Sequence, residues 1–334
     1  MKVTFFQRKP HPQQISIEEL FATVRQYLPD DIEPVVHVAP ELSKGILSRF
    51  RIARAARRSQ GDVNHITGDI HFIAMLLDRR RTILTVHDCV PLTRSSGLRR
   101  SVLKYFWFIL PARYSACVTV ISEKTRRELL EHVTIDPDRI VVIPNCVAPE
   151  FQPGPDRPID PACLRILQIG TADHKNLDTV CEAISGIPCT LDIIGTLSER
   201  QTALLAHHEI RYETSSGLSR EALVAHYHAA DIVTFVSKYE GFGMPVIEAQ
   251  ATATPLITSD ISPMNEIAGA GACRVNPLDA AAIRTAVTRM VQDAPYRTRI
   301  IADGLKNIEQ FRPVAIAGEY AELYRRVCSG GFNR

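Results

Sequence analysis

The chain has 334 residues and a formal net charge of +2, a length that is ample for two domains. Hydrophobic residues make up 45% of it, as in soluble globular proteins, and no apolar run approaches the roughly 18–20 residues that a membrane span needs. The charge is uneven, because residues 1–155 carry 22 Lys and Arg against 16 Asp and Glu, whereas the remainder carries 17 against 21. The basic first half predicts an anionic partner, either a membrane surface or phosphate groups.

The N-terminal sequence and the cysteines both bear on the cellular location. Arg8 and Lys9 stand where a signal peptide would need its apolar core. The eight cysteines form no CxxC pair and no zinc-like spacing, and most lie in or beside apolar runs, which favours reduced, buried thiols. We therefore expect a cytoplasmic protein, with peripheral association at the inner face of the membrane as a further option.

Short apolar, β-branched runs alternate with helical stretches along the whole chain. The runs predict strands at 2–6, 34–39, 62–66, 82–87, 116–121 and 139–144, and at 164–170, 189–195, 209–213, 231–237, 255–259 and 272–276. Near-continuously apolar strands that alternate with helices are typical of parallel sheets covered on both faces. The fold class is therefore α/β.

A proline-rich segment separates the two series of strands. Six prolines fall between Pro144 and Pro161, a density that neither helices nor central strands tolerate. We predict two tandem Rossmann-like, doubly wound domains that face a cleft, at 1–150 and 151–312. Residues 313–334 should form a C-terminal helix that packs back on the first domain, because apolar residues recur at helical spacing over 313–327.

The stretch YEGFGMPVIEA, residues 239–249, follows the strand predicted at 231–237. Gly241 and Gly243 allow a sharp bend, and Pro245 suits the first turn of a helix, whose N-terminus attracts an anion such as diphosphate. Glu248, one turn into that helix, can accept hydrogen bonds from ribose hydroxyls, while Glu240 precedes the bend. This layout matches a nucleotide-sugar, although Glu248 could simply complement the helix dipole and Glu240 could be a solvated loop residue.

Several ordered blocks carry a resemblance to a known family. The sequence SKYEGFGMPVIEAQATATPLITSD resembles the signature of the GT4-type retaining glycosyltransferases (group 1, GT-B fold), with their E-x7-E pattern. Further blocks resemble the family in its usual order: TVHDCVPL at 85–92, VISEKTRRELLEH at 120–132, DRIVVIPNCV at 138–147, LQIGTADHKNLDTVCEAI at 167–184, LSREALVAHYHAADIVTFVS at 218–237, NEIAGAGA at 265–272 and NPLD at 276–279.

The resemblance implies a role for each matching residue on the donor side. Glu248 would hold the donor ribose and Glu240 would contact hydroxyls of the transferred sugar. Lys175 would pair with the diphosphate and stabilise the departing nucleotide, whose negative charge grows in the transition state. The remaining donor-binding residues that we expect are Gly170, Thr171, Gly195, Phe242, Gly243, Met244 and Pro245, with backbone N–H groups of residues 242–244 directed to the sugar and diphosphate.

In the first domain, the resemblance implies that His87 reaches the donor sugar from the other side of the cleft. A buried core histidine is the alternative. Asp88 would either contact the acceptor or cap the next turn. A basic loop replaces the glycine-rich loop that relatives often carry after the first strand, so Arg8 and Lys9 become candidates for binding an anionic acceptor.

The diphosphate site departs from the family pattern. Thr171 follows Gly170 where many relatives carry an arginine, and His174 stands where many have another arginine. This leaves Lys175 as the one clear cation, with His174 or an arginine from elsewhere as a substitute for the missing charge. The DPD sequence at 136–138 resembles a metal motif but sits in an expected turn, and we predict no metal site.

Two stretches combine basic and apolar residues. The segment 44–60 contains Lys44 and five arginines, and the segment 97–114 mixes Arg99, Arg100 and Lys104 with YFWF. Such helices can lie on an anionic bilayer. A solvated face plus a core helix is the alternative.

Together these features predict a retaining, metal-independent glycosyltransferase that uses no cofactor and binds no nucleic acid. It would move a sugar from a UDP- or GDP-sugar to a hydroxyl of a glycan or lipid-linked acceptor in surface polysaccharide synthesis. A nucleotide-sugar epimerase or hydrolase of similar shape and a non-catalytic nucleotide-sugar binding subunit are the alternatives. The sequence leaves the base, sugar, acceptor, linkage and oligomeric state open.

Overall fold

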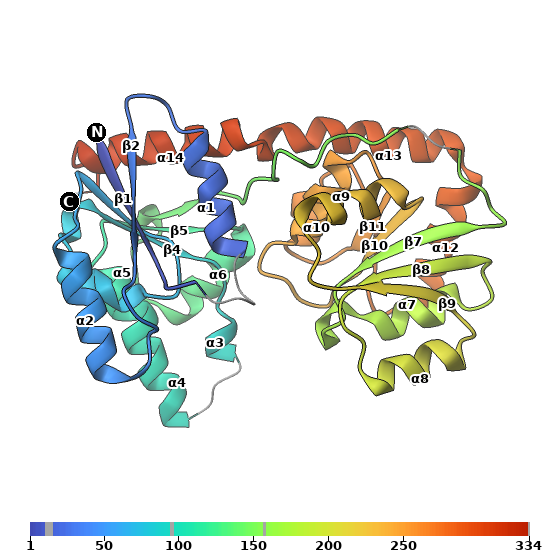
Figure 1. Ribbon diagram of the computed structural model, residues 1–334, viewed down its shortest axis with the longest axis horizontal. Coiled ribbons are helices and arrows are strands. Elements are labelled where there is room, and N and C mark those ends of the chain that lie inside the picture. Colours follow the sequence, from blue (N-terminus) through green and yellow to red (C-terminus); the bar gives the residue numbers. More distant parts are fainter. Residues whose placement is uncertain (11–15, 94–96, 156–157, 333–334) are drawn as a thin grey trace. The chain divides into compact units, whose positions relative to one another are not determined.

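The computed structural model describes residues 1–10, 16–93, 97–155 and 158–332, and the chain divides into two compact units (Figure 1). Unit 1 comprises Met1–Cys146 together with Pro313–Arg334, and unit 2 comprises Val147–Arg312. The first boundary lies at 146/147, whereas the prolines suggested 150/151. One reason is a backbone hydrogen bond of 2.9 Å from the Val147 N–H to the Phe311 carbonyl, which attaches the chain to unit 2 before residue 151.

Unit 1 is built on a six-stranded parallel sheet in the order β2-β1-β3-β4-β5-β6. Its elements are β1 (Lys2–Gln7), α1 (Ser16–Gln26), β2 (Glu33–Val38), α2 (Gly45–Arg57), β3 (Val63–Ile66), 3₁₀ helices at His71–Leu76 and Arg79–Arg81, β4 (Thr82–Val86), α3 (Val90–Thr93), α4 (Gly97–Leu103), a π-helix (Lys104–Ile109), α5 (Leu110–Arg113), β5 (Cys117–Val120), α6 (Glu123–His132), a 3₁₀ helix at Pro137–Arg139, β6 (Ile140–Val142) and α14 (Pro313–Cys328).

Successive strand residues of unit 1 point into two different cores. Phe5 packs in a cluster with residues of α1 and α14, whereas the next residue, Phe6, packs in a second cluster with residues of α2. Because side chains alternate across a strand, burial of both phenylalanines means that both faces of the sheet are covered. This explains why the strands read as unbroken apolar runs.

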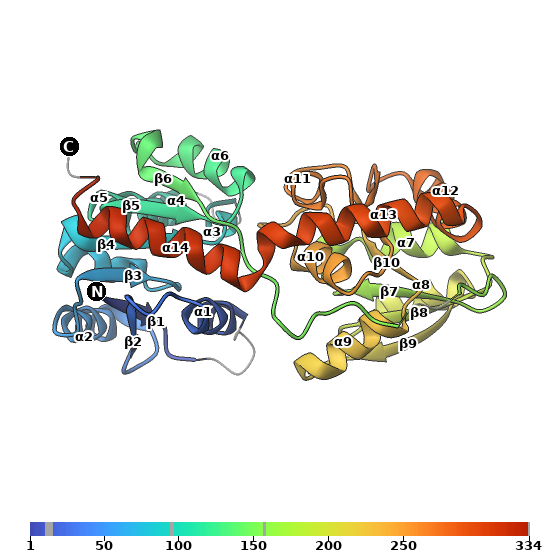
Figure 2. The ribbon, with the colours of Figure 1, turned by 90° about the horizontal axis from the view of Figure 1, so that it is seen from above.

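The C-terminal helix α14 belongs to unit 1. In Figure 2 it lies across one face of the sheet, and its buried residues, which include Ile316, Tyr320 and Tyr324, recur at helical spacing. Inside this interface the buried His65 of β3 contacts the Tyr324 hydroxyl at 2.8 Å through Nδ1 and the Thr85 hydroxyl at 2.7 Å through Nε2. A polar chain therefore links α14 to the centre of the sheet.

Unit 2 holds the second six-stranded parallel sheet, in the order β12-β11-β10-β7-β8-β9. Its elements are β7 (Leu164–Ile169), a 3₁₀ helix at Asp173–Lys175, α7 (Leu177–Ile184), β8 (Cys189–Ile194), α8 (Glu199–His207), β9 (Arg211–Ser215), α9 (Arg220–Ala229), β10 (Ile232–Phe235), α10 (Met244–Ala251), β11 (Leu256–Ser259), α11 (Met264–Ala268), β12 (Cys273–Val275), α12 (Ala280–Gln292), α13 (Ala294–Asn307) and a 3₁₀ helix at Ile308–Phe311.

All twelve predicted strands are present, and the expected α/β class is confirmed. The strand predicted at 209–213 begins two residues later, because Glu209 adopts a left-handed conformation (φ 53°) as the chain leaves α8. The described cysteines are unpaired. Cys89, Cys117, Cys146 and Cys181 are buried as expected, whereas Cys189 and Cys273 are half-buried and Cys163 and Cys328 are exposed. None of the described helices is long and apolar enough to cross a membrane.

Candidate active site

The strand order of unit 2 reverses between β7 and β10. From β7 the chain proceeds through β8 to β9, then returns to place β10 on the other side of β7 and continues to β12. In open parallel sheets, ligands bind beyond the carboxyl ends of the strands at such a reversal. The loop after β7 carries Gly170, Thr171 and Lys175, and the loop after β10 carries Glu240 and Gly243. These expected donor residues therefore follow the two strands that flank the reversal.

Lys175 and Glu240 form an ion pair across these two loops. Lys175 Nζ donates a hydrogen bond of 2.7 Å to Glu240 Oε1, and the side chains are only 18% and 14% exposed. The ammonium also lies 4.8 Å from the centre of the Phe235 ring at the end of β10, a position that favours a cation. A bound anion would compete with Glu240 for this ammonium group.

The backbone around Gly170 fits Lys175 closely. Gly170 has φ +90°, and a Cβ atom built on it would lie 2.9 Å from Lys175 Cγ. The Lys175 carbonyl accepts a hydrogen bond of 3.0 Å from the Gln168 side chain on β7. Glycine is therefore required at 170 both by its conformation and by the approach of the lysine stem.

Two further contacts join the β7 and β10 loops. The Lys238 N–H donates to the His174 carbonyl at 2.8 Å. Asn176, which is buried and left-handed (φ 64°), donates from Nδ2 to the Val236 carbonyl at 3.0 Å and to the Pro277 carbonyl at 2.6 Å. The sequence analysis missed Asn176, although asparagine is one of the few residues that tolerate this conformation. The asparagine fixes the turn that carries Lys175.

The N-terminus of α10 lies at the same edge of the sheet. Gly243 is the N-cap with φ +108°, and Pro245 occupies the first turn, as predicted. Phe242 is buried and its ring packs edge-on against Phe311, with 6.0 Å between ring centres. The first N–H groups of a helix have no acceptor within the helix, so the start of α10, beginning at Met244, is suited to an anion.

Glu248 on α10 is held by a residue that the sequence analysis missed. The hydroxyl of the fully buried Tyr227, on α9, donates to Glu248 Oε2 at 2.6 Å. Burial raises the pKa of Glu248, and the Tyr227 hydrogen bond and the charges of Arg220 and Lys175 oppose that rise. Tyr227 therefore orients the Glu248 carboxylate through one of its two oxygens.

Thr171 and Gly195 meet where the β7 and β8 ends come together. Gly195 has φ +152°, and a Cβ on it would lie 2.7 Å from Thr171 Cγ2. Thr171 Oγ1 donates to the Thr196 carbonyl at 2.8 Å, and the Gln201 side chain donates to the Thr171 carbonyl at 2.6 Å. The hydroxyl and the backbone carbonyl of Thr171 thus both help to fix the shape of this loop, and the uncharged side chain supplies no substitute for an arginine.

Unit 1 places its candidate residues at the carboxyl ends of its own strands. His87, directly after β4, bonds through Nε2 to the Thr67 carbonyl at 3.0 Å. Because a carbonyl only accepts, Nε2 carries the proton and Nδ1 keeps a lone pair. Burial lowers the pKa of His87, which favours this neutral form.

The other unit 1 candidates are engaged to different degrees. Asp88 Oδ1 accepts from the Val90 N–H at 3.0 Å, so it caps the following turn. Arg8 donates to Glu18 and to Asp69, each at 2.8 Å, which offsets much of its attraction for an anionic acceptor. Lys9 is exposed.

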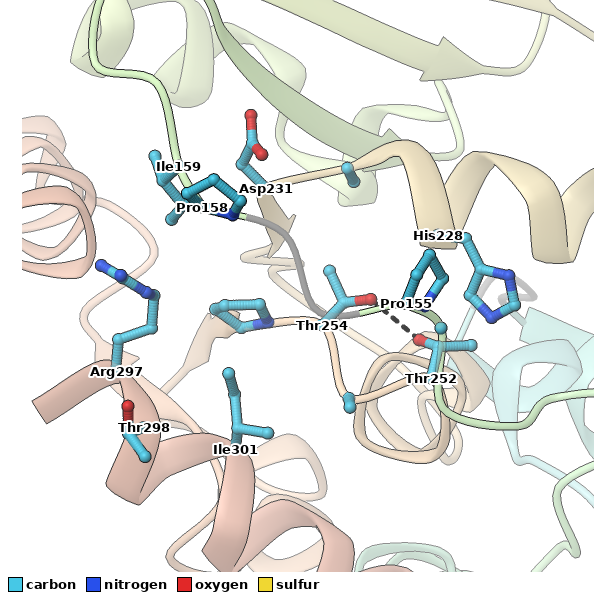
Figure 3. A pocket seen from close by; sticks show the side chains of 14 residues that line it. Pro155, Pro158, Ile159, His228, Asp231, Thr252, Thr254, Arg297, Thr298 and Ile301 are labelled. Carbon is cyan, nitrogen blue, oxygen red and sulfur yellow. Dashed lines mark hydrogen bonds between the residues drawn. The ribbon is translucent and has the colours of Figure 1, made fainter. Parts of the chain in front are cut away.

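The amino-terminal edge of the unit 2 sheet has a pocket of about 550 Å³ (Figure 3). Asp231 and Pro255, which directly precede β10 and β11, line it together with α13 residues such as Arg297. The dashed line in Figure 3 is the 2.9 Å bond between the Thr252 and Thr254 hydroxyls. Because the strands are parallel, this pocket lies at the opposite edge of the sheet from the loops that carry the expected donor residues.

The described part of the chain contains no group of three or more His, Cys, Asp or Glu side chains that could hold a metal ion. In the DPD sequence, Asp136 Oδ1 accepts from the Asp138 N–H at 3.0 Å and caps the 3₁₀ helix that follows. This is the turn role that the sequence indicated.

Comparisons with known proteins connect this arrangement to curated relatives. The MMP alpha-(1->4)-mannosyltransferase of Mycolicibacterium hassiacum is 28% identical over 232 residues, which are 64% of this chain and 55% of that protein. O-antigen chain mannosyltransferase B of Escherichia coli is 26% identical over 263 residues, which are 69% of this chain and 66% of that protein. The chain thus spans between a half and two thirds of the length of these two relatives.

The fold likeness covers nearly the whole chain. The crystal structure of Anabaena HepE in complex with UDP-glucose has a TM-score of 0.78 at 13% identity, over 97% of this chain and 99% of that one. A family model described as Glycosyltransferase Family 4 matches residues 3–151, and one described as Glycosyl transferases group 1 matches residues 159–307. The chain therefore belongs to the GT4-type glycosyltransferases of the group 1 family and has their GT-B fold.

Proposed function

We propose that the protein is a glycosyltransferase that moves a sugar from a nucleoside diphosphate sugar to an acceptor hydroxyl in surface polysaccharide synthesis. The observation that carries the proposal is the Lys175–Glu240 ion pair, at the reversal point of the unit 2 sheet and beside the N-terminus of α10. Family membership and the two mannosyltransferase relatives support it.

The donor would extend along the carboxyl edge of unit 2. Glu248, oriented by Tyr227, would accept hydrogen bonds from the ribose hydroxyls, and the N-terminus of α10 would face the diphosphate. The diphosphate would take Lys175 from Glu240, which leaves the Glu240 carboxylate to accept hydrogen bonds from the sugar. The same residues thus change partners when the donor binds.

Chemistry at this site needs a group that stabilises the leaving diphosphate. The bond between the sugar C1 and the phosphate oxygen breaks, and the departing oxygen gains negative charge next to the Lys175 ammonium. A bond then forms between C1 and the acceptor oxygen, whose proton passes to the departing phosphate. Departure and attack on one face give retention of configuration, and we propose that Lys175 and the α10 N-terminus serve where other enzymes use a metal ion.

For unit 1 we keep the role that the resemblance implies for His87, a contact with a hydroxyl of the transferred sugar. Its neutral Nδ1 can accept a hydrogen bond because the Thr67 carbonyl holds the proton on Nε2. Lys9 remains a candidate for contact with an anionic acceptor.

The two relatives narrow the choice of sugar. Both are named as mannosyltransferases, so mannose is our first candidate for the transferred sugar. Glucose is the second candidate for the transferred sugar, because the Anabaena neighbour was crystallised with UDP-glucose. We further propose that the acceptor is a glycan or a lipid-linked sugar and that the enzyme works in the cytoplasm at the inner face of an anionic membrane, which the basic helix α2 would contact.

A thermal-shift panel tests the donor. Ligands that bind the folded state raise its melting temperature, so one of GDP-mannose, UDP-glucose and their free nucleotides should raise it, and Lys175→Ala should reduce the rise. A donor that is hydrolysed or epimerised without any acceptor would instead favour the epimerase or hydrolase alternative. If no nucleotide or sugar nucleotide shifts the transition at millimolar concentration, the proposed donor site is wrong.

A further inference from the structure

Unit 1 has an apolar groove that the proposed reaction does not use. It encloses about 1090 Å³ and runs between α2, the 3₁₀ helix at His71–Leu76 and the α4–π-helix segment; α2 and α4 are labelled in Figure 1. The lining residues are Ile46, Arg49, Phe50, Ala53, Phe72, Met75, Leu76, Leu98, Val102, Leu103, Phe106 and Trp107.

The lining leaves a polar ligand with little to bond. Arg49 is the one charged side chain among the described lining residues, and the Trp107 indole N–H is the other side-chain hydrogen-bond donor. The Arg49 guanidinium stacks on the Trp107 ring at 4.6 Å and its Nε donates to Ser43 Oγ at 3.3 Å. A groove walled by hydrocarbon and aromatic side chains suits a hydrocarbon chain, since each methylene moved out of water strengthens binding by about fourfold.

Several apolar side chains at the rim of the groove are largely exposed to solvent. Ile46 is 85% exposed, Leu98 81% and Phe50 58%. Apolar patches of this kind on a folded unit mark a binding surface. For the segment 97–114 the alternative prediction is a solvated face plus a core helix. Tyr105 and Phe106 of this segment are exposed on the π-helix, so they do not belong to a core.

The charged residues around the groove indicate which kind of headgroup a bound hydrocarbon chain would carry. Residues 42–61 and 89–122, which contain α2 and the α4–π-helix segment, carry eleven Lys and Arg and no Asp or Glu. The cations on these segments that the structure describes as exposed are Lys44, Arg51, Arg54, Arg57, Arg58, Arg100 and Arg113. One of these cations, Arg51, lies 3.8 Å from the Glu41 carboxylate, so the surroundings of the groove are mostly rather than purely cationic. A groove that is apolar inside and mostly cationic outside matches a lipid that carries phosphate. A symmetric second copy would bring like charges together, which disfavours a dimer here.

One wall of the groove adjoins the strand ends of unit 1. The Trp107 carbonyl accepts a hydrogen bond of 2.8 Å from His71 Nδ1, and His71 lies close enough to Asp69 and Asp88 for their charges to raise its pKa against the lowering effect of burial. A chain in the groove would therefore have its headgroup near the residues expected on the acceptor side.

We propose that this groove binds the hydrocarbon chain of a phosphate-linked lipid acceptor, with the phosphate among the basic side chains of the rim. The lipid acceptor rests on the proposed transferase function, but binding of the chain does not. The groove would hold the acceptor by its lipid and present its sugar to the transfer site.

The chain supplies its own reporter for this binding. Trp107 lines the groove and is the one tryptophan in the sequence. Geranylgeranyl monophosphate, below its micelle concentration, should change the Trp107 fluorescence and bind at least about a hundredfold more tightly than isopentenyl monophosphate, which has the same headgroup on a short chain. Equal affinities for the two phosphates would overturn the proposal.

Matched variants separate the groove from general surface effects. Phe50→Glu and Val102→Glu change exposed groove residues and should each weaken geranylgeranyl monophosphate binding at least tenfold. Leu278→Glu, at a 70% exposed position on unit 2, makes the same type of change away from the groove and should leave binding unchanged. Equal effects of Phe50→Glu and Leu278→Glu would contradict the assignment.

Two other occupants give different results. If sedimentation shows a dimer that Phe50→Glu dissociates and geranylgeranyl monophosphate does not, a second copy fills the groove and the proposal fails. If phosphatidylglycerol vesicles bind in a Phe50-dependent way while the monophosphate does not, the surface seats a bilayer rather than one acceptor chain. Because no sugar donor is present, failure of the transferase function would appear separately, as absence of transfer by protein that still binds the probe.

Discussion

Lys175 Nζ donates to Glu240 Oε1 at 2.7 Å, so the expected cation of the diphosphate site is neutralised by the expected sugar-binding carboxylate. The two residues lie 65 positions apart in the chain and follow different strands of the sheet. Without a ligand the pair keeps two partly buried charges compensated. When an anionic donor binds, its phosphate would replace Glu240 as the partner of Lys175. Its sugar hydroxyls would replace Lys175 as the partner of Glu240.

Replacement of the cation tests this exchange. Lys175→Ala should lower kcat for transfer by about 10²–10³, because the leaving diphosphate loses its fixed positive charge. The matched control is Lys238→Ala, which removes an exposed lysine from the neighbouring loop and should leave kcat within about twofold. Steady-state kinetics on both variants, with circular dichroism to check folding, makes the comparison. A Lys175→Ala enzyme that keeps near-normal kcat would remove Lys175 from the mechanism.

The ionised Glu248 side chain should destabilise the folded protein when no donor is bound. Burial raises its pKa, so the folded state favours the protonated acid, and the stability associated with that form is lost as pH rises through the raised pKa. Glu248→Gln should therefore raise the melting temperature at pH 7, with a gain that shrinks towards zero near pH 4. The same variant should weaken donor binding by about tenfold or more, because an ionised acceptor of ribose hydrogen bonds is gone.

Melting curves between pH 4 and 8 and calorimetric titration with the donor measure both effects. Tyr227→Phe is the informative partner variant, because it keeps the carboxylate and removes only its 2.6 Å donor; it should lower stability at pH 7. Equal donor affinity in the wild type and Glu248→Gln would contradict the ribose role.

Much of the fold could be predicted from sequence, because parallel strands buried on both faces leave a direct composition signal. The predicted runs, the proline-rich segment and the helix that became α14 all reflect local chemistry. The opening phenylalanines, Phe5 and Phe6, illustrate this, since burial on both faces forbids alternation with polar residues.

The partners within the site could not be predicted in the same way. Tyr227 sits on α9 and Glu248 on α10, and only the packing of these helices in the folded unit brings the hydroxyl to the carboxylate. Asn176 carried a signal in its residue type, but its acceptors at Val236 and Pro277 are 60 and 101 residues away. Contacts of this kind depend on tertiary geometry rather than on periodicity or propensity.

The glycine before the diphosphate loop offers a steric test. Gly170→Ala adds a Cβ atom 2.9 Å from Lys175 Cγ at a φ of +90°, whereas Gly217→Ala adds one in open space at a φ of +64°. Both variants should lose about 1–2 kcal/mol of stability from the strained backbone, but only Gly170→Ala should displace Lys175 and lose transfer activity, by about tenfold or more. Denaturant unfolding and kinetics on the two proteins separate the strain from the clash. Similar activities in the two variants would show that the approach of Lys175 to Gly170 is unimportant.

The buried His65 in unit 1 should make the stability of the folded protein depend on pH. Burial lowers its pKa to about 3, against an ordinary value of about 6.5 in the unfolded chain. The unfolded state thus binds one more proton between these values, and stability falls as pH falls, by about 1.4 kcal/mol per pH unit from this group. His65→Phe removes the titration but leaves the Tyr324 hydroxyl without its partner, so it should cost about 1–3 kcal/mol at pH 7. Urea unfolding at several pH values should show the wild-type advantage shrinking below pH 6.5, and a difference that stays constant down to pH 4 would show that His65 does not control the acid response.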